Sequence, residues 1–531
     1  MHTPPSLESS AMSFTVRQVR SEKKPSRLRA LLSVGLPLVL SALQMEKHLK
    51  EAKKSDNEQK RREKSLKRTV TVLLSCLFVL LLLIGTLKAV VRLKAMAFGM
   101  VSLVGAEVAA DKDGYTNLLL LGAGDKDHDG IDLTDTIMVT SLDPAKTKSV
   151  VMLSIPRDTY ILKTEKMGKN RINSLYRDYK AELAREGMSK EEASAEALKQ
   201  LGAEIGTLLG LEIHGVVKVN FSGFVEGVDL LGGVDIEVPS DIVDTEYPGP
   251  NYTYETFSIG AGKQHFDGET ALKYARSRHS TSDFSRSARQ QQIIAAVAAK
   301  AQEQGLVKNL GKISEMLSIV AKNMESTFSA RELLGLAAMG KAIDSSRIVS
   351  VQLNDQNGLY GSSVGQGGFL YAPPREEFDG AAVLLPVSIP EFPVTWKQID
   401  AYVNLLVRNR ALFIREIPIV VLNAGAKEGL ARKMGGELYR YDLDVEATRN
   451  LGGGITTETS SIAVNPALET GGDATRAKLM RAQQAAKFLS EVLKIQQKES
   501  VSPEAFSKEG ADVAIILGKD YSYTPLQDLL K

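Results

Sequence analysis

The stretch LLLLGAGDKDHDGIDLTDTIMVT, residues 118–140, places a short acidic segment between two apolar runs. Each run has the length and aliphatic content of a buried strand, and the aspartates and glycines between them favour a turn. Five aspartates stand within eleven positions there, at 125, 127, 129, 132 and 135. The pattern predicts two strands joined by an acidic loop.

The residues that follow continue an α/β pattern. Residues 148–156, KSVVMLSIP, are typical of another short buried strand. A helix is expected over 189–209, because Ser189 and Glu192 match a capping box and Gly210 ends the run.

Further along, residues 215–239 predict a strand, a short helix and a strand, with glycines at the turns. A second long helix is expected over 285–304, and helical pattern continues over 307–342. Residues 354–375 are rich in glycine and proline and are typical of surface loops. No repeat of fixed period is present.

A separate unit is predicted to begin near residue 415. Residues 416–425, EIPIVVLNAG, indicate a strand and a turn, 475–495 a helix, and 511–521, ADVAIILGKDY, a closing strand. A span of about 110 residues suits an independent small α/β domain.

Composition excludes several classes of site. The formal net charge of +2 over 531 residues says nothing in bulk about nucleic-acid or acidic partners, so only local charge clusters are informative. We expect no nucleic-acid partner. The single cysteine, Cys76, excludes an intramolecular disulfide and a cysteine-based zinc site.

The N-terminal region contains a predicted membrane span. Thr69–Leu87 is a run of nineteen uncharged, mostly aliphatic residues, enough to cross a bilayer core of about 30 Å. Lysine and arginine are concentrated before this run, so we expect a cytoplasmic N-terminus and an extracytoplasmic remainder. A shorter uncharged run, Ala30–Leu43, contains Pro37 and precedes Met45, at which we expect translation to start. A cellular peptide upstream of Met45 would contradict that start.

The acidic loop allows three interpretations. Asp125, Asp127, Asp129 and Gly130 match the first half of an EF-hand, but Thr136 stands where the bidentate glutamate is required. The central residues suit a solvated turn. Asp125 and Asp135 each adjoin a predicted strand, and such a carboxylate pair suits Mg²⁺ with water and phosphate oxygens. Whether Asp127, Asp129 or Asp132 also reaches a metal stays open.

Several cationic and polar residues follow strands or begin helices, where anion sites are usually built. Arginine forks there favour bidentate contacts to phosphate. The candidates are Arg157 and Asp158 in SIPRDTY, Arg171 and Asn173 in RINSLY, Arg276 and Arg278 in ALKYARSRHS, and Asp283, Arg286, Arg289 and Gln290 in DFSRSARQQQ. Together they indicate a site for an anion with several phosphates.

Two other patterns carry little weight. Residues 361–365, GSSVG, match a nucleophile elbow, but glycine-rich loop surrounds them and no histidine follows His279. His214, His265 and His279 are too scattered to predict a triad or a zinc site.

Seven motifs in order resemble the LytR-CpsA-Psr family of membrane-anchored wall-polymer ligases, from about residue 115 to 390. They are NLLLLGAGD, TDTIMVTSLDP, VVMLSIPRDTY, RINSLY, VKVNFSGFVEGVDLLGGVDIEVP, AGKQHFDGETALKYARSRH and DFSRSARQQQ. Residues 415–520 resemble the C-terminal domain often attached to these proteins.

The resemblance implies a Mg²⁺-dependent phosphotransferase in the plasma membrane of a bacterium. It would move a glycopolymer from a polyprenyl-pyrophosphate carrier to a peptidoglycan hydroxyl through a phosphodiester. The alternatives are a polyprenyl-pyrophosphate hydrolase with the same site, and a non-enzymatic protein of the wall with a binding or regulatory role.

The resemblance also implies roles for individual residues. Asp125 and Asp135 would hold Mg²⁺, and Arg157, Arg276, Arg278 and Arg286 would bind the pyrophosphate, with Asp283 and Gln290 orienting that cluster. Asp158 or Asp283 would act as a base or orient an arginine, and we favour orientation. Arg171, which replaces the lysine of many members, would bind substrate with Asn173 and Arg289.

The expected fold class is α/β, with a transmembrane helix, a central mixed sheet flanked by helices, and a small separate α/β domain. The expected segments are a cytoplasmic basic region (1–68), the span (69–87), a juxtamembrane linker (88–114), the catalytic domain (115–390), a linker (391–414) and the C-terminal domain (415–520).

Overall fold

The computed structural model describes most of the chain from residue 107 to residue 530. The gaps are 126–129, 165–167, 250–252, 278–282, 304–318, scattered positions between 320 and 341, 360–362, 390–392, 471, 499–504 and 507–509. The predicted span and start site lie outside the described residues. Among the helices of the described part, none is both long and apolar enough to cross a membrane.

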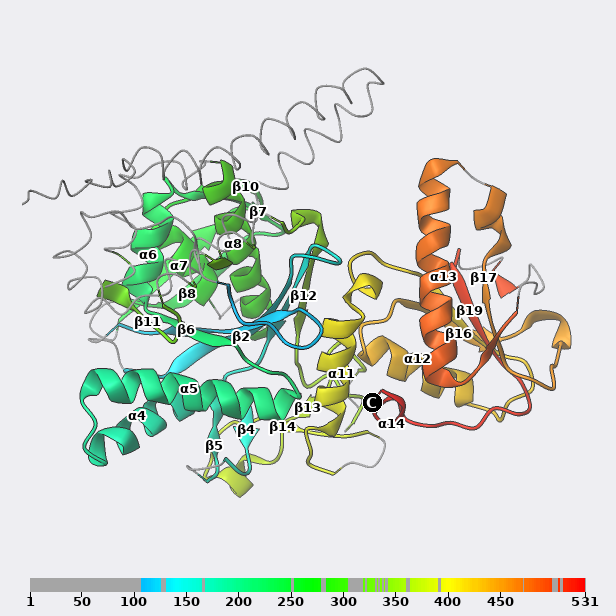
Figure 1. Cartoon of the computed structure of the whole chain (residues 1–531), viewed down its shortest axis with the longest axis horizontal. Coiled ribbons are helices and arrows are strands. Elements are labelled where there is room, and N and C mark those ends of the chain that lie inside the picture. Colours follow the sequence, from blue (N-terminus) through cyan, green and yellow to red (C-terminus); the bar gives the residue numbers. More distant parts are fainter. Residues whose placement is uncertain are drawn as a thin grey trace, which may run out of the picture. The chain divides into compact units, whose positions relative to one another are not determined.

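A six-stranded sheet forms the centre of the first domain (Figure 1). In spatial order its strands are β11 (Met324–Ser326), β6 (Gly215–Val219), β1 (Thr116–Ala123), β2 (Thr134–Asp143), β3 (Ser149–Ser154) and β12 (Ile348–Gln352). The pairs β1–β6 and β3–β12 are parallel, whereas β11–β6, β1–β2 and β2–β3 are antiparallel. The predicted mixed sheet is therefore confirmed.

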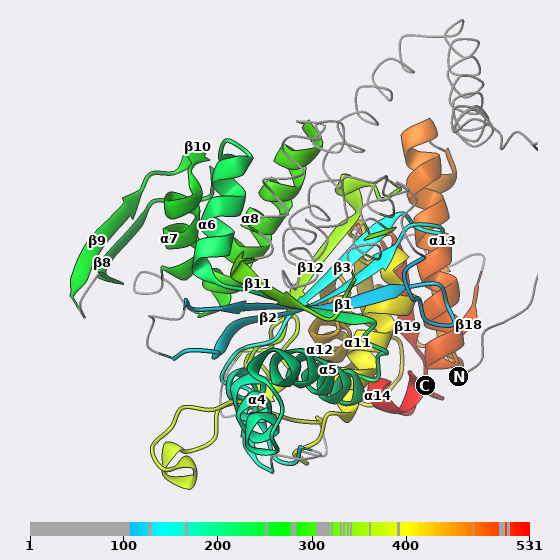
Figure 2. The ribbon, with the colours of Figure 1, turned by 60° about the vertical axis from the view of Figure 1, so that its left-hand side comes forward.

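Helices cover both faces of this sheet, with α4 and α5 on one side and α6, α7 and α8 on the other (Figure 2). They are α4 (Leu175–Arg185), α5 (Lys190–Leu209), α6 (Phe221–Leu230), α7 (Gly268–Arg276) and α8 (Asp283–Glu303). Because strand side chains alternate, Leu119 and Leu121 pack with α4 and α5, while Leu118 packs with α6, α7 and α8.

Local signals in the sequence account for the predicted helices. In α5, the Ser189 hydroxyl accepts the Glu192 N–H at 3.3 Å, the Glu192 carboxylate accepts the Ser189 N–H at 3.1 Å, and Gly210 is left-handed with φ 63°. Helix α8 corresponds to the helix predicted over 285–304. Most of the helical pattern predicted over 307–342 lies outside the described residues.

Four two-stranded pairs surround the central sheet. They are β7 (Val234–Val238) with β10 (Gly262–Phe266), β8 (Ile242–Pro248) with β9 (Tyr254–Ile259), β4 (Tyr160–Ile161) with β5 (Asn170–Arg171), and β13 (Leu370–Tyr371) with β14 (Leu385–Pro386). The strand predicted at the end of 215–239 is β7, and it pairs with β10 rather than with the central sheet.

The C-terminal part forms a second sheet, in the order β16-β15-β19-β17-β18. Its strands are β15 (Ile419–Asn423), β16 (Val445–Asn450), β17 (Ser461–Val464), β18 (Gln496–Gln497) and β19 (Val513–Leu517), and its helices are α12 (Leu430–Arg440), α13 (Asp473–Leu493) and α14 (Leu526–Leu529). The predicted strands near 416 and 511 and the predicted helix near 475 are β15, β19 and α13.

The stretch 391–414, predicted to be a linker, contains the helix α11 (Lys397–Arg408). Most of its apolar residues are buried, and the ring of Tyr402 lies 4.7 Å from that of Phe369 and 5.9 Å from that of Tyr441, centroid to centroid. Phe369 precedes β13 and Tyr441 follows α12. Helix α11 is therefore a part of the core that contacts both domains.

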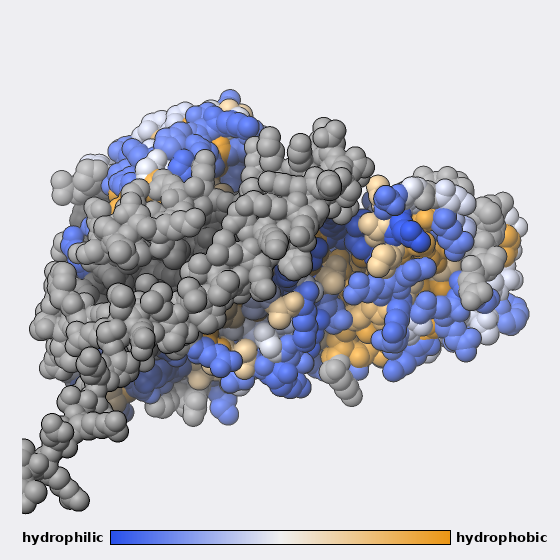
Figure 3. Space-filling model, turned by 45° about the horizontal axis from the view of Figure 1, so that its top comes forward, coloured by the Kyte–Doolittle hydropathy of each residue, from blue (hydrophilic) through white to orange (hydrophobic). Residues whose placement is uncertain are grey.

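In the view of Figure 3, hydrophilic residues predominate on the described surface, and apolar residues show between them on the part that is not drawn in grey. The most exposed large apolar side chains are Tyr254 at 70% and Met480 at 66%. They stand on different elements, and single exposed apolar residues are ordinary in folded proteins. Neither indicates a site.

A buried arginine follows α11 and fixes this segment on the central sheet. Arg410 is 1% exposed and donates to the Ser141 carbonyl at 3.1 Å and the Ser141 hydroxyl at 2.8 Å. Its guanidinium also lies 4.2 Å from the centre of the Tyr115 ring. Burial lowers the pKa of Arg410 to about 10, although the Asp143 carboxylate opposes this change.

We expect Arg410→Met to lower the free energy of unfolding by about 3 kcal/mol, because Ser141 acceptors stay buried without their donor. Arg408→Ala is the matched control, since Arg408 forms an exposed ion pair with Asp113 worth about 0–1 kcal/mol. Urea unfolding followed by the fluorescence of Trp396, the single tryptophan, at the start of α11, measures both. Equal losses would contradict the prediction.

Candidate active site

One edge of the central sheet gathers the segments that carry the predicted site residues. β1 and β2 run antiparallel with Ala123 opposite Thr134, so the acidic loop leaves and enters the sheet at one edge. β6 is parallel to β1, and β3 is antiparallel to β2, so both end at that edge too. Asp125, Asp135 and Arg157 therefore belong to one loop cluster, a usual location for sites in α/β folds.

Asp135, the second residue of β2, lies between an arginine and an amide. Its Oδ2 atom accepts from Arg157 Nη1 at 2.8 Å, and its Oδ1 accepts from Asn173 Nδ2 at 3.3 Å. The neighbouring Thr134 hydroxyl donates to the Asn173 carbonyl at 3.2 Å. The Asp135 side chain is still 47% exposed, so its carboxylate faces solvent as well as these partners.

Asp158 extends the cluster to a second arginine. Its carboxylate lies 3.7 Å from Arg157 Nε and 3.3 Å from Arg171 Nη1. The backbone supports this arrangement, because Tyr160 pairs with Arg171 between β4 and β5. The turn after β3 and the strand β5 thus place two guanidinium groups around one carboxylate. The Asp158 carboxylate therefore contacts both arginines at once.

Asp125 is held at the N-terminus of α6. Its carboxylate accepts from the Ser222 N–H at 3.1 Å and from the Ser222 hydroxyl at 2.9 Å. Asn220 caps the same helix by accepting the Gly223 N–H at 2.8 Å. A carboxylate at this position is favoured by the free N–H groups and the helix dipole.

The same helix end contacts a predicted phosphate-binding arginine. Arg276, the last residue of α7, places its guanidinium 4.2 Å from the centre of the Phe221 ring and 5.6 Å from that of Tyr247. Phe221 is the residue before Ser222, so α6 links Asp125 to Arg276. Sequence reasoning missed Phe221 and Ser222. The signal available for them was Asn220, a residue type that favours the start of a helix at the next position.

Helix α8 brings its polar residues beside α7 and the end of β3. Arg289 is 5% exposed and donates from Nε to the Tyr274 carbonyl at 2.9 Å, and Gln290 donates to the Ala275 carbonyl at 3.4 Å. Gln291 donates to the Ser154 hydroxyl at 3.0 Å, three residues before Arg157.

The other predicted residues are partly or wholly outside the description. Arg286 is buried on α8 at 8% exposure. Asp283 is the first residue of α8, but its side chain lies outside the described part. Arg278, Asp127 and Asp129 lie outside the described residues altogether.

The donor set around Asp135 fits a hard divalent cation. The Oδ1 atom of Asn173 is buried and has no hydrogen-bond partner among the described residues, although its Nδ2 is bonded to Asp135. Within the described residues, no group of three or more His, Cys, Asp or Glu side chains is arranged to hold a metal. Mg²⁺ requires only one or two carboxylates when waters and phosphate oxygens complete its shell.

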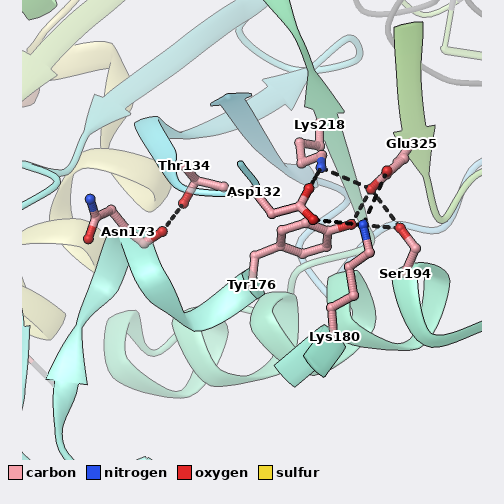
Figure 4. A network of polar contacts seen from close by, with 8 residues as sticks. All are labelled: Asp132, Thr134, Asn173, Tyr176, Lys180, Ser194, Lys218 and Glu325. Carbon is pink, nitrogen blue, oxygen red and sulfur yellow. Dashed lines mark hydrogen bonds and ion pairs between the residues drawn. The ribbon is translucent and has the colours of Figure 1, made fainter. Parts of the chain in front are cut away.

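Asp132, from the same loop, belongs to a separate network of charges (Figure 4). Lys218 on β6 lies 2.5 Å from its Oδ1, and Lys180 on α4 lies 2.8 Å from its Oδ2. Both lysines also approach Glu325 on β11, at 3.1 and 3.8 Å. Tyr176 and Ser194 donate hydroxyl hydrogen bonds to Glu325.

This network is electrically balanced, with two carboxylates and two ammonium groups. Burial by itself raises the pKa of Asp132, but the Lys218 and Lys180 charges outweigh burial and lower it. The pKa of Glu325 is lowered in the same way, against burial, by Lys218 and Lys180. Both oxygens of Asp132 are engaged by lysines and its side chain is only 18% exposed, whereas the Asp135 side chain is 47% exposed and therefore more accessible to a cation.

We expect Asp132→Asn to lower the free energy of unfolding by about 2 kcal/mol at pH 7, because two lysines lose their shared anion. Asn tolerates the left-handed φ of 64° at this position, so backbone strain adds little. Since the folded pKa of Asp132 is lowered, its contribution is present above the unfolded pKa of 3.8 and disappears as pH falls through the folded pKa.

Urea unfolding of both proteins between pH 7 and pH 2.5 measures this difference. Glu182→Gln is the control, because Glu182 pairs with Arg185 on the exposed surface of α4. A difference between wild type and Asp132→Asn that is equally large at both ends of the pH range would contradict charge pairing as its source.

Comparison with known proteins places this site in context. The chain is 29% identical over 382 residues to the cell wall biosynthesis protein LcpA of Corynebacterium glutamicum, with 68% of each protein covered. It is 28% identical over 219 residues to the polyisoprenyl-teichoic acid–peptidoglycan teichoic acid transferase TagU of Oceanobacillus iheyensis, a match of 41% of this chain and 60% of that protein. The crystal structure of TagV from B. subtilis is 22% identical, with a TM-score of 0.39 over 55% of this chain and 97% of that one.

Family models match both domains. The model described as LytR cell envelope-related transcriptional attenuator matches residues 416–521. The model of the LytR_cpsA_psr family matches residues 85–379, more than half of the chain. The chain therefore belongs to the LytR-CpsA-Psr family, as its ordered motifs predicted.

Proposed function

We propose that this protein is a membrane-anchored phosphotransferase that moves a glycopolymer from a polyprenyl-pyrophosphate carrier to peptidoglycan through a phosphodiester bond. Membership of the family supports the proposal. One relative is named as a polyisoprenyl-teichoic acid–peptidoglycan teichoic acid transferase, and another for cell wall biosynthesis. The anchor is the predicted span Thr69–Leu87, with the catalytic domain outside the plasma membrane.

The observation that carries the proposal is the arginine cluster at the end of β3. Arg157 and Arg171 lie around Asp158, and Arg157 also contacts Asp135. Planar guanidinium groups bind phosphate oxygens in pairs, and these two are 22% and 42% exposed, so an anion has access to them. A pyrophosphate would meet preoriented positive charge, which is the main contribution of proteins to phosphoryl transfer.

The reaction exchanges one phosphorus–oxygen bond for another. An acceptor hydroxyl oxygen of peptidoglycan forms a bond to the phosphorus that carries the glycan. The bond from that phosphorus to the bridging oxygen breaks, polyprenyl phosphate leaves with the bonding electrons, and the hydroxyl proton passes to a base or to solvent. Arg157, Arg171 and Arg276 would neutralise charge on the phosphate oxygens. Asp158 would orient the two arginines that it contacts, Arg157 and Arg171.

A Mg²⁺ ion would be held by Asp135 and Asp125, with the orphan oxygen of Asn173 as an additional donor. When bound, such an ion supplies positive charge at the pyrophosphate.

We expect Arg157→Ala to reduce kcat/KM for glycan transfer by about 100-fold, because one positive group next to the reacting phosphate is lost. The assay incubates the detergent-solubilised protein with labelled lipid-linked glycan, Mg²⁺ and peptidoglycan, and measures label joined to peptidoglycan. Arg185→Ala is the matched control, because Arg185 is 72% exposed and pairs only at the surface with Glu182.

The same assay separates the alternative functions. Label that is released but never joined to peptidoglycan would replace the transferase by a polyprenyl-pyrophosphate hydrolase. Transfer and release at the level of a reaction without protein, in wild type as in Arg185→Ala and an Arg157→Ala, Arg276→Ala double variant, would favour a non-enzymatic role in the wall.

We expect chelation of divalent cations to abolish transfer, and Asp135→Asn to raise the Mg²⁺ concentration for half-maximal rate about tenfold or more, because one anionic oxygen is lost. Asp132→Asn is the control in this titration, since its two lysine partners occupy it. A larger shift for Asp132→Asn than for Asp135→Asn would reverse the assignment of the ligand.

A further inference from the structure

The turn after α7 contains a fully buried serine next to a predicted phosphate-binding arginine. Ser277 is 0% exposed, and its extended backbone, φ −54° and ψ 137°, ends the helix directly after Arg276. Its N–H still donates to the Lys273 carbonyl at 2.9 Å. The side chain of Ser277 therefore points into the protein. The neighbouring Arg276 extends toward the rings of Phe221 on α6 and Tyr247 on β8.

The partner of Ser277 is a carboxylate with no exposed surface. The Ser277 hydroxyl donates to Asp244 Oδ2 at 2.8 Å, and Asp244 is 0% exposed on β8. The same strand carries Tyr247, whose ring lies 5.6 Å from the Arg276 guanidinium. β8 thus contributes both the acceptor that fixes Ser277 and one of the rings that contact Arg276.

Helix α8 closes the other side of this turn. The last carbonyl groups of a helix lack partners within it and carry partial negative charge. At the end of α7, Arg289 donates to the carbonyls of Tyr274 and Ser277, and Gln290 donates to that of Ala275. Burial lowers the pKa of Arg289, and the charges of Tyr274 and Asp244 oppose this change. These contacts aim the Arg289 side chain at the backbone of α7.

We propose that Asp244, Ser277 and Arg289 are positioning residues that hold the end of α7 so that Arg276 is presented to a pyrophosphate group. This inference rests on the proposed function. Arg289 acts through Arg276 rather than on the substrate, which differs from the direct substrate contact expected from the motif. Asp244 and Ser277 are new assignments.

The geometry explains why a small change would be transmitted. Without the Ser277 hydroxyl, Asp244 loses a buried donor, and the turn loses its link to β8. Arg276 would keep its charge and its contacts with the neighbouring aromatic rings, but its side chain would sample more orientations. The affinity for pyrophosphate would then fall although no group that touches it has been removed.

The test is binding of geranyl pyrophosphate to the full detergent-solubilised chain by isothermal titration. Ser277→Ala is expected to weaken binding about tenfold. Thr147→Val is the matched control, because the Thr147 hydroxyl donates at 2.6 Å to Asp143, a carboxylate 1% exposed at the opposite end of β2. It is expected to lose similar thermal stability and to bind geranyl pyrophosphate as the wild type does.

Arg276→Ala in the same titration separates this inference from the proposed function. If Arg276→Ala binds as tightly as the wild type, the assignment of this site to pyrophosphate fails. If Arg276→Ala weakens binding while Ser277→Ala matches Thr147→Val, the positioning role is overturned and the function stands.

A second variant covers the case in which Ser277→Ala does not fold. Arg289→Lys keeps the positive charge at the end of α7, but one ammonium group cannot reproduce the planar fork that reaches both Tyr274 and Ser277. Its binding is expected to weaken about tenfold. Binding equal to that of the wild type would overturn the role of this cluster.

Discussion

The pairing of β1 on both sides determines where the segments of the candidate site leave the central sheet. Its antiparallel partner β2 brings the acidic loop back to the edge it left, and its parallel partner β6 ends at that same edge. The loop after β3 arrives there because β3 is antiparallel to β2. A carboxylate, a helix N-terminus and an arginine thus meet through backbone direction alone. Side chains at these strand ends are close enough for direct hydrogen bonds, as between Asp125 and Ser222 and between Asp135 and Arg157.

Helices then fix what the sheet brings near. The N-terminus of α6 attracts the Asp125 carboxylate, and the C-terminus of α7 attracts the Arg289 guanidinium, which is how helix dipoles favour opposite charges. Because Phe221 and Arg276 are in contact, these two helix ends also touch each other. The site therefore adjoins two helix ends, whose free N–H and carbonyl groups require hydrogen-bond partners. Fold stability and site geometry thus depend on the same contacts.

Much of this could be predicted where the signal is local. The capping box of Ser189 and Glu192 and the positions of Asp135 and Arg157 next to strand ends depend on near neighbours in sequence. Pairings across long separations could not be predicted. The alternation in β7 indicates a strand but not the strand with which it pairs. Lys218 is a single charge in an apolar strand, and its sequence neighbours do not reveal that it pairs with Asp132 and Glu325. Residues 391–414 were predicted as a linker because the sequence of a short amphipathic run between two domains does not reveal which surface it packs against.

Exposure divides the charges of this protein into two kinds. The pairs around Arg157 and Arg171 are partly solvated, and such pairs contribute about 0–1 kcal/mol, so a phosphate can replace a carboxylate at low cost. The groups around Arg289, Asp244 and Arg410 are buried, and loss of one partner there costs about 3–5 kcal/mol, so they keep their geometry when ligands come and go. An enzyme that exchanges charged substrates requires both kinds. In the proposed reaction, the partly exposed arginines would bind phosphate, and the buried charges would hold the backbone from which those arginines extend.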